Sequence, residues 1–172
     1  MTDKLLRNVL LALKPKFNCL RELIKAAHSE GRSVLVRFNN DADGVSAALA
    51  LSHAWNWMKF LQHNSAVYTL GNALSDLSIY SFEGKAPLVL LVDFGSNVES
   101  AEGIRHLVAN GAEAAVIDHH PLEAETEHIL LISPWVVLGD SSVTSGMLCA
   151  ELAKGERKNI QHLDTLARIS AA

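Results

Sequence analysis

The sequence lacks three features that would each point to a class of protein: a membrane-spanning run, a cysteine pattern and a block of basic residues. No apolar stretch among its 172 residues approaches the length of a membrane span, and the charged, amphipathic first twenty residues are unlike a signal peptide. The two cysteines, Cys19 and Cys149, lie far apart and in no metal-ligand spacing. We expect both to be buried free thiols in a cytoplasmic protein rather than partners in a disulfide.

Positive charge is also scarce. The chain has 15 Lys and Arg against 19 Asp and Glu, a formal net charge of −4, with no basic run. It therefore has no general electrostatic attraction for nucleic acid, and an anionic substrate would need local help, for instance from metal ions. A composition that is 49% hydrophobic and 20% charged excludes a disordered chain and suits about one globular domain.

What is present is an alternation of apolar strand-like runs and amphipathic helical segments. The unbroken "LVLLVDFG" run predicts a strand buried on both faces. We therefore expect an α/β fold: a doubly wound, mostly parallel sheet of about five strands with helices on both faces, of Rossmann-like type. The expected strands cover residues 33–38, 66–70, 88–95, 112–120 and 128–133. The expected helices cover residues 44–64, 99–111, 142–155 and 159–172.

Residues 1–32 predict an N-terminal helical segment packed on the domain, either a helical hairpin or one helix interrupted at Pro15. The domain proper then spans residues 33–172. Because the chain stops inside an apolar helical pattern, we expect it to be the front part of a longer protein.

Acidic and histidine residues gather where three of the strands end. Asp41 and Asp43 follow the first strand, Asp93 follows "LVLLV", and Asp118-His119-His120 follows "AEAAVI". Ligands of parallel sheets bind at the carboxyl ends of the strands, so the three clusters should converge there. Carboxylate and imidazole ligands together suit manganese, magnesium or zinc.

The spacing of the first cluster supports this interpretation. Residues two apart at a strand end point the same way, so Asp41 and Asp43 can face one site, and Gly44 allows a tight turn into a helix. The D-x-D-G pattern alone is common in turns and helix caps. The His119-His120 pair directly after Asp118 is rarer, and the combination of all three clusters is more specific.

The motifs "NNDADG", "VDFG" and "IDHH", in this order, resemble the DHH phosphoesterase superfamily. The superfamily includes RecJ-type single-strand exonucleases, oligoribonucleases, cyclic-dinucleotide phosphodiesterases and family II inorganic pyrophosphatases. The segment "ISPWVVLGDSSVTSGMLCAEL" is similar to the one that follows the DHH motif in archaeal RecJ-like proteins. The resemblance runs from about residue 33 to the end.

The resemblance implies two divalent ions, with manganese expected and magnesium as the alternative. Asp93 matches the aspartate that bridges the two ions. Asp41 matches a ligand of the first ion, and Asp43 and His119 match ligands of the second. Together the ions would activate water and clamp the phosphoryl oxygens.

Two catalytic assignments complete this picture. His120 matches the histidine that faces the phosphate, and Asp118 should orient a neighbouring histidine. Ser145 and Gly146, in the Ser/Gly-rich turn, are candidates for binding the substrate phosphate at a helix N-terminus, although serine N-capping explains the same pattern. The histidines outside the motif are expected to be surface or cap residues: His28, His53, His63, His106, His128 and His162.

The sequence departs from the family pattern at Asn39. The usual first motif has histidine at this position, and an amide is a poorer ligand for a transition metal than imidazole, so the first metal site should be weakened. The family also has a fourth motif, an aspartate beyond the last helix here, and a C-terminal substrate-binding domain. The chain ends before both.

Two functions follow as hypotheses. The first is a metal-dependent phosphodiesterase, a RecJ-like single-strand nuclease of archaeal type acting on single-stranded nucleic acid or short oligonucleotides. The second, which Asn39 favours, is an inactive RecJ-like scaffold subunit of an archaeal replicative helicase complex, with replication proteins of GINS type as partners. In either case these 172 residues alone should show little activity.

Overall fold

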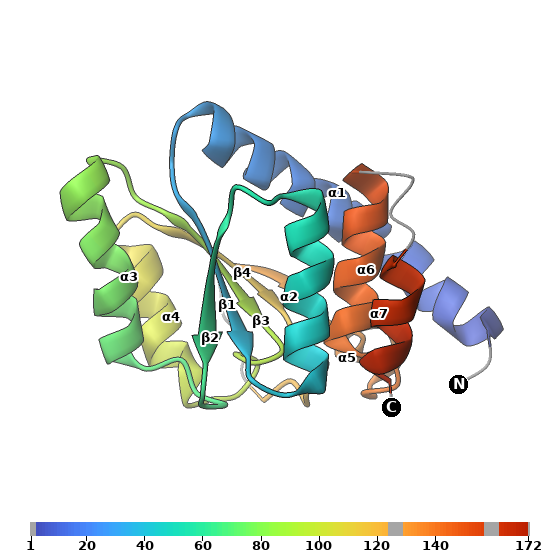
Figure 1. Cartoon of the computed structure of the whole chain (residues 1–172). Coiled ribbons are helices and arrows are strands. Elements are labelled where there is room, and N and C mark those ends of the chain that lie inside the picture. The colour runs from blue at the N-terminus through green and yellow to red at the C-terminus, as the bar shows by residue number, and fades with distance from the viewer. Residues whose placement is uncertain (1–2, 124–128, 157–161, 172) are drawn as a thin grey trace.

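A computed structural model describes residues 3–123, 129–156 and 162–171 of the chain. Its centre is a five-stranded, all-parallel sheet with the strand order β2-β1-β3-β4-β5 (Figure 1). The strands are β1 (Val34–Asn39), β2 (Lys59–His63), β3 (Leu88–Val92), β4 (Glu113–Ile117) and β5 (Leu130–Ile132). The expected fold class is therefore confirmed.

Helices cover both faces of the sheet. On one face lie α1 (Asp3–Ser29), α2 (Ala42–Ala54), α6 (Ser145–Glu156) and α7 (Leu163–Ile169), and on the other lie α3 (Leu70–Glu83) and α4 (Ser100–Ala109) (Figure 1). A single turn, α5 (Trp135–Leu138), follows β5. Within the described residues, no helix is both long and apolar enough to cross a membrane.

The central strand β3 explains the unbroken apolar run in the sequence. Leu88, Leu90 and Val92 pack into the core beneath α1, α2 and α6, whereas Val89 and Leu91 pack into the core beneath α3 and α4. All five residues are buried, because β3 is the central strand of a parallel sheet that helices cover on both faces.

The first helix runs through its proline without a break. We expected an interruption at Pro15, but α1 is one helix from Asp3 to Ser29. Pro15 is exposed, so the lost hydrogen bond lies on the solvent side of the helix. The buried stripe continues on both sides of it, with Leu13 before and Phe17 after, and its burial in the core stabilises the continuous helix.

The prediction was wrong between residues 55 and 83. The helix expected over 44–64 ends at Ala54, and its second half contains β2 at Lys59–His63, while the strand expected over 66–70 is a loop followed by α3. As an edge strand, β2 is only half-buried, so its mixed polar and apolar residues gave no strand periodicity. Tyr68, which looked strand-like, is a core residue of the loop.

Other expected elements are confirmed. The strands expected over 88–95, 112–120 and 128–133 contain β3, β4 and β5, and the helices expected over 99–111, 142–155 and 159–172 contain α4, α6 and α7. His128 and residues 159–161 lie outside the described part. Both cysteines are free thiols as expected, but only Cys149 is buried, and Cys19 lies on the exposed side of α1.

A buried ion pair joins β1 to α3. Arg37 donates from Nε and Nη2 to both carboxylate oxygens of Asp76, at 2.8 and 2.7 Å, and the Tyr68 hydroxyl donates to the same carboxylate at 2.8 Å. All three side chains are buried. Burial and the neighbouring Asp76 charge raise the pKa of Tyr68 well above its usual range, so it remains a neutral donor.

We predict that Asp76→Ala lowers the free energy of unfolding by about 3–5 kcal/mol, because it leaves the Arg37 charge buried without its partner. Asp164→Ala, which breaks the exposed Lys154–Asp164 pair, is the control and should cost less than about 1 kcal/mol. Urea unfolding of both variants measures the difference. Equal losses would show that the buried pair contributes no more than a surface pair.

Candidate metal centre

The three motifs meet at the carboxyl edge of the sheet because β1, β3 and β4 are neighbours. Asn39 ends β1, Asp93 follows β3 directly, and Asp118 follows β4 directly. The chain crosses from β1 to β2 on one side and reaches β3 on the other, so the site lies at the point where the winding reverses. Open parallel sheets bind their ligands there.

Asp93 lies at the centre of the site. It is fully buried, and its backbone has a φ of 67°, the only positive φ at a non-glycine residue in the described part of the chain. Its Oδ1 accepts a hydrogen bond from the Ser145 hydroxyl at 3.0 Å, and its Oδ2 accepts one from the Asn39 amide at 3.4 Å. A left-handed, buried aspartate is a locally costly arrangement of the kind found at functional sites.

Asn39 acts as a donor between two carboxylates. Its Nδ2 donates to Asp41 Oδ2 at 2.9 Å as well as to Asp93. Asp41 in turn is the N-cap of α2, and its Oδ1 accepts the Gly44 amide at 2.9 Å. A Cβ atom at Gly44 would lie 2.2 Å from the Asn39 carbonyl oxygen, so glycine is required for α2 to begin this close to the strand.

Asp43 is buried and held by the first turn of α6. Its two carboxylate oxygens accept the backbone amides of Ser145 and Gly146, at 2.9 and 2.6 Å. The helix N-terminus therefore binds an anion, but the anion is the chain's own carboxylate. Ser145 and Gly146, predicted to contact a substrate phosphate, are buried and donate to Asp43 in this structure, and their role toward a substrate stays a prediction.

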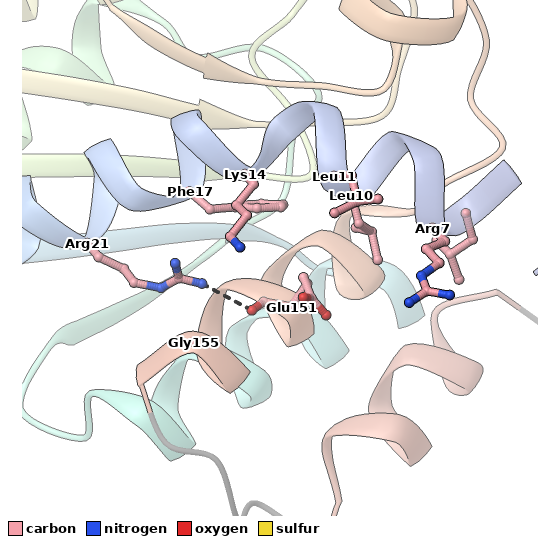
Figure 2. A pocket seen from close by; sticks show the side chains of 9 residues that line it. Arg7, Leu10, Leu11, Lys14, Phe17, Arg21, Glu151 and Gly155 are labelled. Carbon is pink, nitrogen blue, oxygen red and sulfur yellow. Dashed lines mark hydrogen bonds between the residues drawn. The ribbon is translucent and has the colours of Figure 1, made fainter. Parts of the chain in front are cut away.

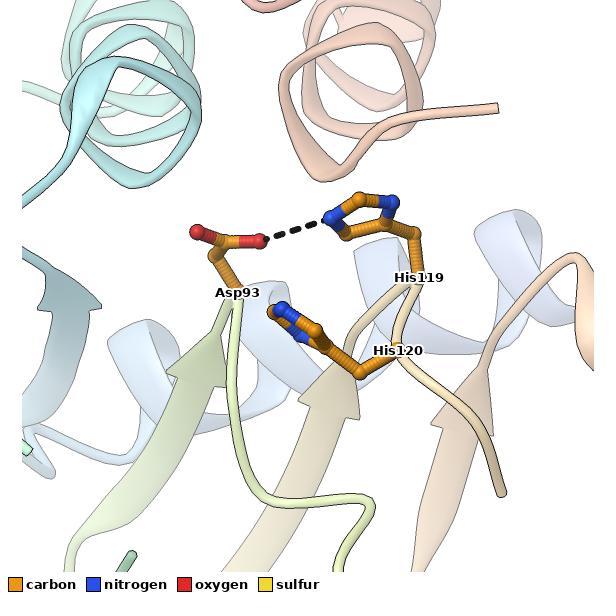
Figure 3. Close-up of side chains that lie close together, drawn as sticks. All are labelled: Asp93, His119 and His120. Carbon is orange, nitrogen blue, oxygen red and sulfur yellow. Dashed lines mark ion pairs between the residues drawn. The ribbon is translucent and has the colours of Figure 1, made fainter. Parts of the chain in front are cut away.

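His119 faces the two buried carboxylates. Its Nε2 lies 3.4 Å from Asp43 Oδ2. The same atom lies 3.5 Å from Asp93 Oδ1, the pair marked in Figure 3. The Trp135 indole donates to the His119 carbonyl oxygen at 3.0 Å and to the Ser141 hydroxyl at 3.1 Å. This tryptophan, from the segment after β5, holds the backbone that carries the imidazole.

His120 is oriented by Asp118. The His120 Nδ1 atom lies 2.7 Å from Asp118 Oδ1, and the buried Asp118 carboxylate also accepts the backbone amides of Ser96 and His120. Asp93, His119 and His120 offer ligand atoms that all lie within 4.8 Å of one another (Figure 3). The three side chains therefore surround one small space that could hold a cation, with Asp41 and Asp43 beside it.

The electrostatics of the site favour a cation. Burial and the nearby charges of Asp43 and Asp41 raise the pKa of Asp93 to about 8, and burial also raises the pKa of Asp43. The hydrogen bond and charge of Asp118 raise the pKa of His120 to about 9. Burial opposes ionisation of Asp118, but its contacts with His120 outweigh this and lower its pKa. A bound divalent cation would relieve the repulsion among the carboxylates.

A cavity of about 230 Å³ opens beside the cluster. Asn39, Asp93, Asp118 and His120 lie on its wall, together with Asn97 and Glu123 from the following loops. It has room for a phosphoryl group next to the candidate ligands.

The structure brings all the predicted site residues into one connected group: Asn39, Asp41, Asp43, Asp93, Asp118, His119, His120, Ser145 and Gly146. Sequence reasoning missed the contact of Trp135 with His119, because a tryptophan 16 residues away has no local signal. It was also wrong about His63, which is buried and stacks on Phe94 at a ring-centroid distance of 4.4 Å.

Sequence comparison gives two matches. The model of the DHH family, N-terminal domain, matches residues 33–171. A protein of Methanocaldococcus jannaschii, the uncharacterized protein MJ1198, is 30% identical over an alignment of 175 positions, gaps included, that covers 85% of this chain and 23% of that protein. The chain therefore spans about a quarter of the length of this relative.

Comparison with solved structures gives similar folds. The DHH domain of PF0399, described as a member of the S1p family of ribosomal proteins, has a TM-score of 0.81 at 29% identity, covering 92% of this chain and 44% of that one. The exonuclease RecJ bound to manganese has a TM-score of 0.61 at 19% identity, and the match covers 94% of this chain and 41% of that one. CDC45 from Entamoeba histolytica has a TM-score of 0.62 at 16% identity, and the match covers 89% of this chain and 32% of that one. The last two likenesses concern the fold alone.

We predict that, in the presence of a chelator, the protein loses stability as the pH rises from about 5 to 8. A carboxyl whose folded pKa lies above its unfolded value holds its proton more tightly when folded, so each rise in pH favours unfolding, by at most about 1.4 kcal/mol per pH unit for one proton. The raised pKa of His120 acts in the same direction above about pH 6.5. Asp93→Asn should therefore reduce the fall in the free energy of unfolding with pH below about pH 6.5.

Urea unfolding of the wild type and of Asp93→Asn at several pH values measures this. Asp164→Asn, an exposed carboxylate whose pKa is lowered by Lys154, is the control and should leave the slope unchanged over this range. If the free energy of unfolding falls with pH equally in the wild type and in Asp93→Asn, the pKa of Asp93 is not raised by folding.

Proposed function

We propose that this chain, which belongs to the DHH family, is the metal-binding domain of a divalent-cation-dependent phosphoesterase that cleaves phosphodiester bonds in single-stranded nucleic acid, as a RecJ-like nuclease does. The observation that supports the proposal most is Asp93, which lies between Asp41, Asp43 and His119 and whose pKa is raised by burial and by the charges of Asp43 and Asp41. Such a concentration of negative charge is most stable around cations.

The proposed metal ligands are Asp41, Asp43, Asp93 and His119. Two divalent ions are expected, and manganese is favoured because the RecJ structure of similar fold was solved with it. When bound, the ions supply positive charge that stabilises the phosphoryl transition state and makes a water molecule more acidic. The bridging role proposed for Asp93 fits its position between the residues from β1 and those from β4.

The chain's own residues would position the substrate and stabilise its negative charge. His120 is half-exposed on the wall of the cavity, and with a pKa of about 9 it is protonated at neutral pH. It can therefore donate a hydrogen bond to a phosphoryl oxygen, while Asp118 fixes the ring and stabilises its charge. Ser145 and Gly146 would act on the substrate indirectly, because their hydrogen bonds hold Asp43 and Asp93 in place.

A second function is favoured by Asn39. Asn39 stands where the family pattern has a histidine, and its side-chain amide donates to Asp41 and Asp93. These hydrogen bonds stabilise the two carboxylates in a way that the first metal ion would otherwise do. We therefore keep as the alternative a scaffold role in an archaeal replication complex, with partners of GINS type and without catalysis. The similar fold of CDC45 agrees with this alternative.

We predict that calorimetry with manganese detects two ions bound to the protein, and that the intact protein cleaves 5′-labelled single-stranded DNA in manganese. Asp93→Ala should abolish cleavage and the binding of at least one ion, because it removes the shared ligand. Asp164→Ala, outside the site, should change neither. No cleavage in manganese, magnesium or cobalt, with two ions bound, would favour the scaffold. Failure to bind any ion would refute the metal centre itself.

Asn39→His separates the two functions further. If the remaining ligands are arranged for a first ion, imidazole in place of the amide should tighten manganese binding about tenfold or more. Asn40→His, the exposed neighbour, is the control and should have little effect. An unchanged affinity in Asn39→His would show that the first site is lost beyond this one ligand.

A further inference from the structure

A groove between α1 and α6 lies outside the metal centre. Its volume is about 520 Å³, and its floor is apolar: Leu6, Leu10, Leu11 and Phe17 of α1. Leu11 is 58% exposed, one of the more exposed large apolar side chains of the described chain. The α1 part of the groove runs from Leu6 to Arg21, about 22 Å at the rise of an α-helix.

Three basic side chains line this groove at seven-residue spacing. Arg7, Lys14 and Arg21 extend from α1 on the side that faces α6 (Figure 2). Seven residues are close to two helical turns, so the three charges form one stripe along the helix. The facing helix contributes a single carboxylate to the groove lining, that of Glu151.

Arg21 closes one end of the groove. Its guanidinium donates to the carbonyl oxygens of Leu152 and Glu151, at 3.1 and 3.3 Å, and it packs so closely on Gly155 that a side chain there would clash with it. Arg7 and Lys14 form no ion pair within the described residues. The groove thus combines an apolar floor with an excess of positive charge, three basic side chains against the one carboxylate of Glu151.

The charge of α1 is opposite to that of the chain. The helix has six basic and two acidic residues, while the remainder of the chain has nine basic and seventeen acidic residues. The basic surface is therefore concentrated on this helix, and an acidic partner would be attracted to it and repelled by most of the rest.

We infer that this groove docks an acidic amphipathic α-helix from a protein partner. A helix of about four turns matches the groove's length, its apolar residues at positions i, i+3, i+4 and i+7 would cover Leu11, and its glutamates or aspartates would face Arg7 and Lys14. The inference does not depend on the proposed catalytic function.

Two other occupants fit less well. A second copy of this chain, docked symmetrically, would place the basic stripe against itself. Single-stranded nucleic acid binds through exposed aromatic rings beside basic residues, whereas the one aromatic side chain of the groove, Phe17, is buried in the core.

The test is selection from a displayed library of 16-residue helical peptides. Each peptide has leucine at i, i+3, i+4 and i+7 positions and Glu, Lys, Gln or Ser elsewhere. The immobilised protein should enrich peptides with an excess of Glu over Lys. Binding of the best peptide should weaken about tenfold or more in Arg7→Glu/Lys14→Glu and in Leu11→Ser.

Matched controls separate the groove from general charge and hydrophobicity. Arg105→Glu/Arg168→Glu makes the same change in net charge on exposed positions of α4 and α7, and Leu74→Ser removes a leucine of similar exposure, 54%, from α3. Both should leave the affinity unchanged, and circular dichroism should show that every variant is folded.

The inference is overturned if no peptide is enriched, if the enriched peptides have no excess of Glu, or if the groove variants bind them as well as the wild type. A 16-nucleotide oligothymidine is tested in parallel. If it binds and loses affinity in Arg7→Glu/Lys14→Glu, the groove is a nucleic-acid surface and the helix-docking inference is overturned.

Discussion

The repulsion among three carboxylates at one edge of a sheet is the constraint on which this structure depends. Asp93 is buried between Asp41 and Asp43, and the chain compensates with donors: the Asn39 amide, the Ser145 hydroxyl and the first amides of α6. These donors do not suffice, because the pKa of Asp93 remains raised to about 8. A bound cation would relieve the remaining repulsion and let Asp93 ionise, and this supports the proposal that the arrangement is a metal centre.

The fold class and the convergence of the motif residues at one edge of the sheet could both be predicted from the sequence. Asp41, Asp93 and His119 each stand at the end of an apolar run, and the parallel topology alone implies that such ends converge. Between residues 55 and 83 the prediction failed, because β2 is a half-exposed edge strand whose partner, β1, lies more than twenty residues away. The periodicity of a short segment does not report a pairing of that range.

Side-chain contacts over long sequence distances were equally hidden. Nothing near Asp43 indicates that the amides of Ser145 and Gly146, about a hundred residues later, bind its carboxylate. His63 looked like a surface histidine, yet it stacks on the ring that follows Asp93, and burial lowers its pKa. Such roles depend on which strands become neighbours, which is a property of the whole chain and not of any motif.

The glycine at position 146 has a consequence for how closely the helices beside the site approach one another. A Cβ atom there would lie 2.4 Å from the Ser170 Cβ and 2.9 Å from the Ser46 hydroxyl, so α2, α6 and α7 meet with no spare volume between them. Asp43 is on the first turn of α2, and its two amide donors are on the first turn of α6. A larger residue at position 146 would push α6 away from α2 and α7, and would move with it the two amides that hold the Asp43 carboxylate. The close packing of three helices therefore fixes where Asp43 lies beside Asp93.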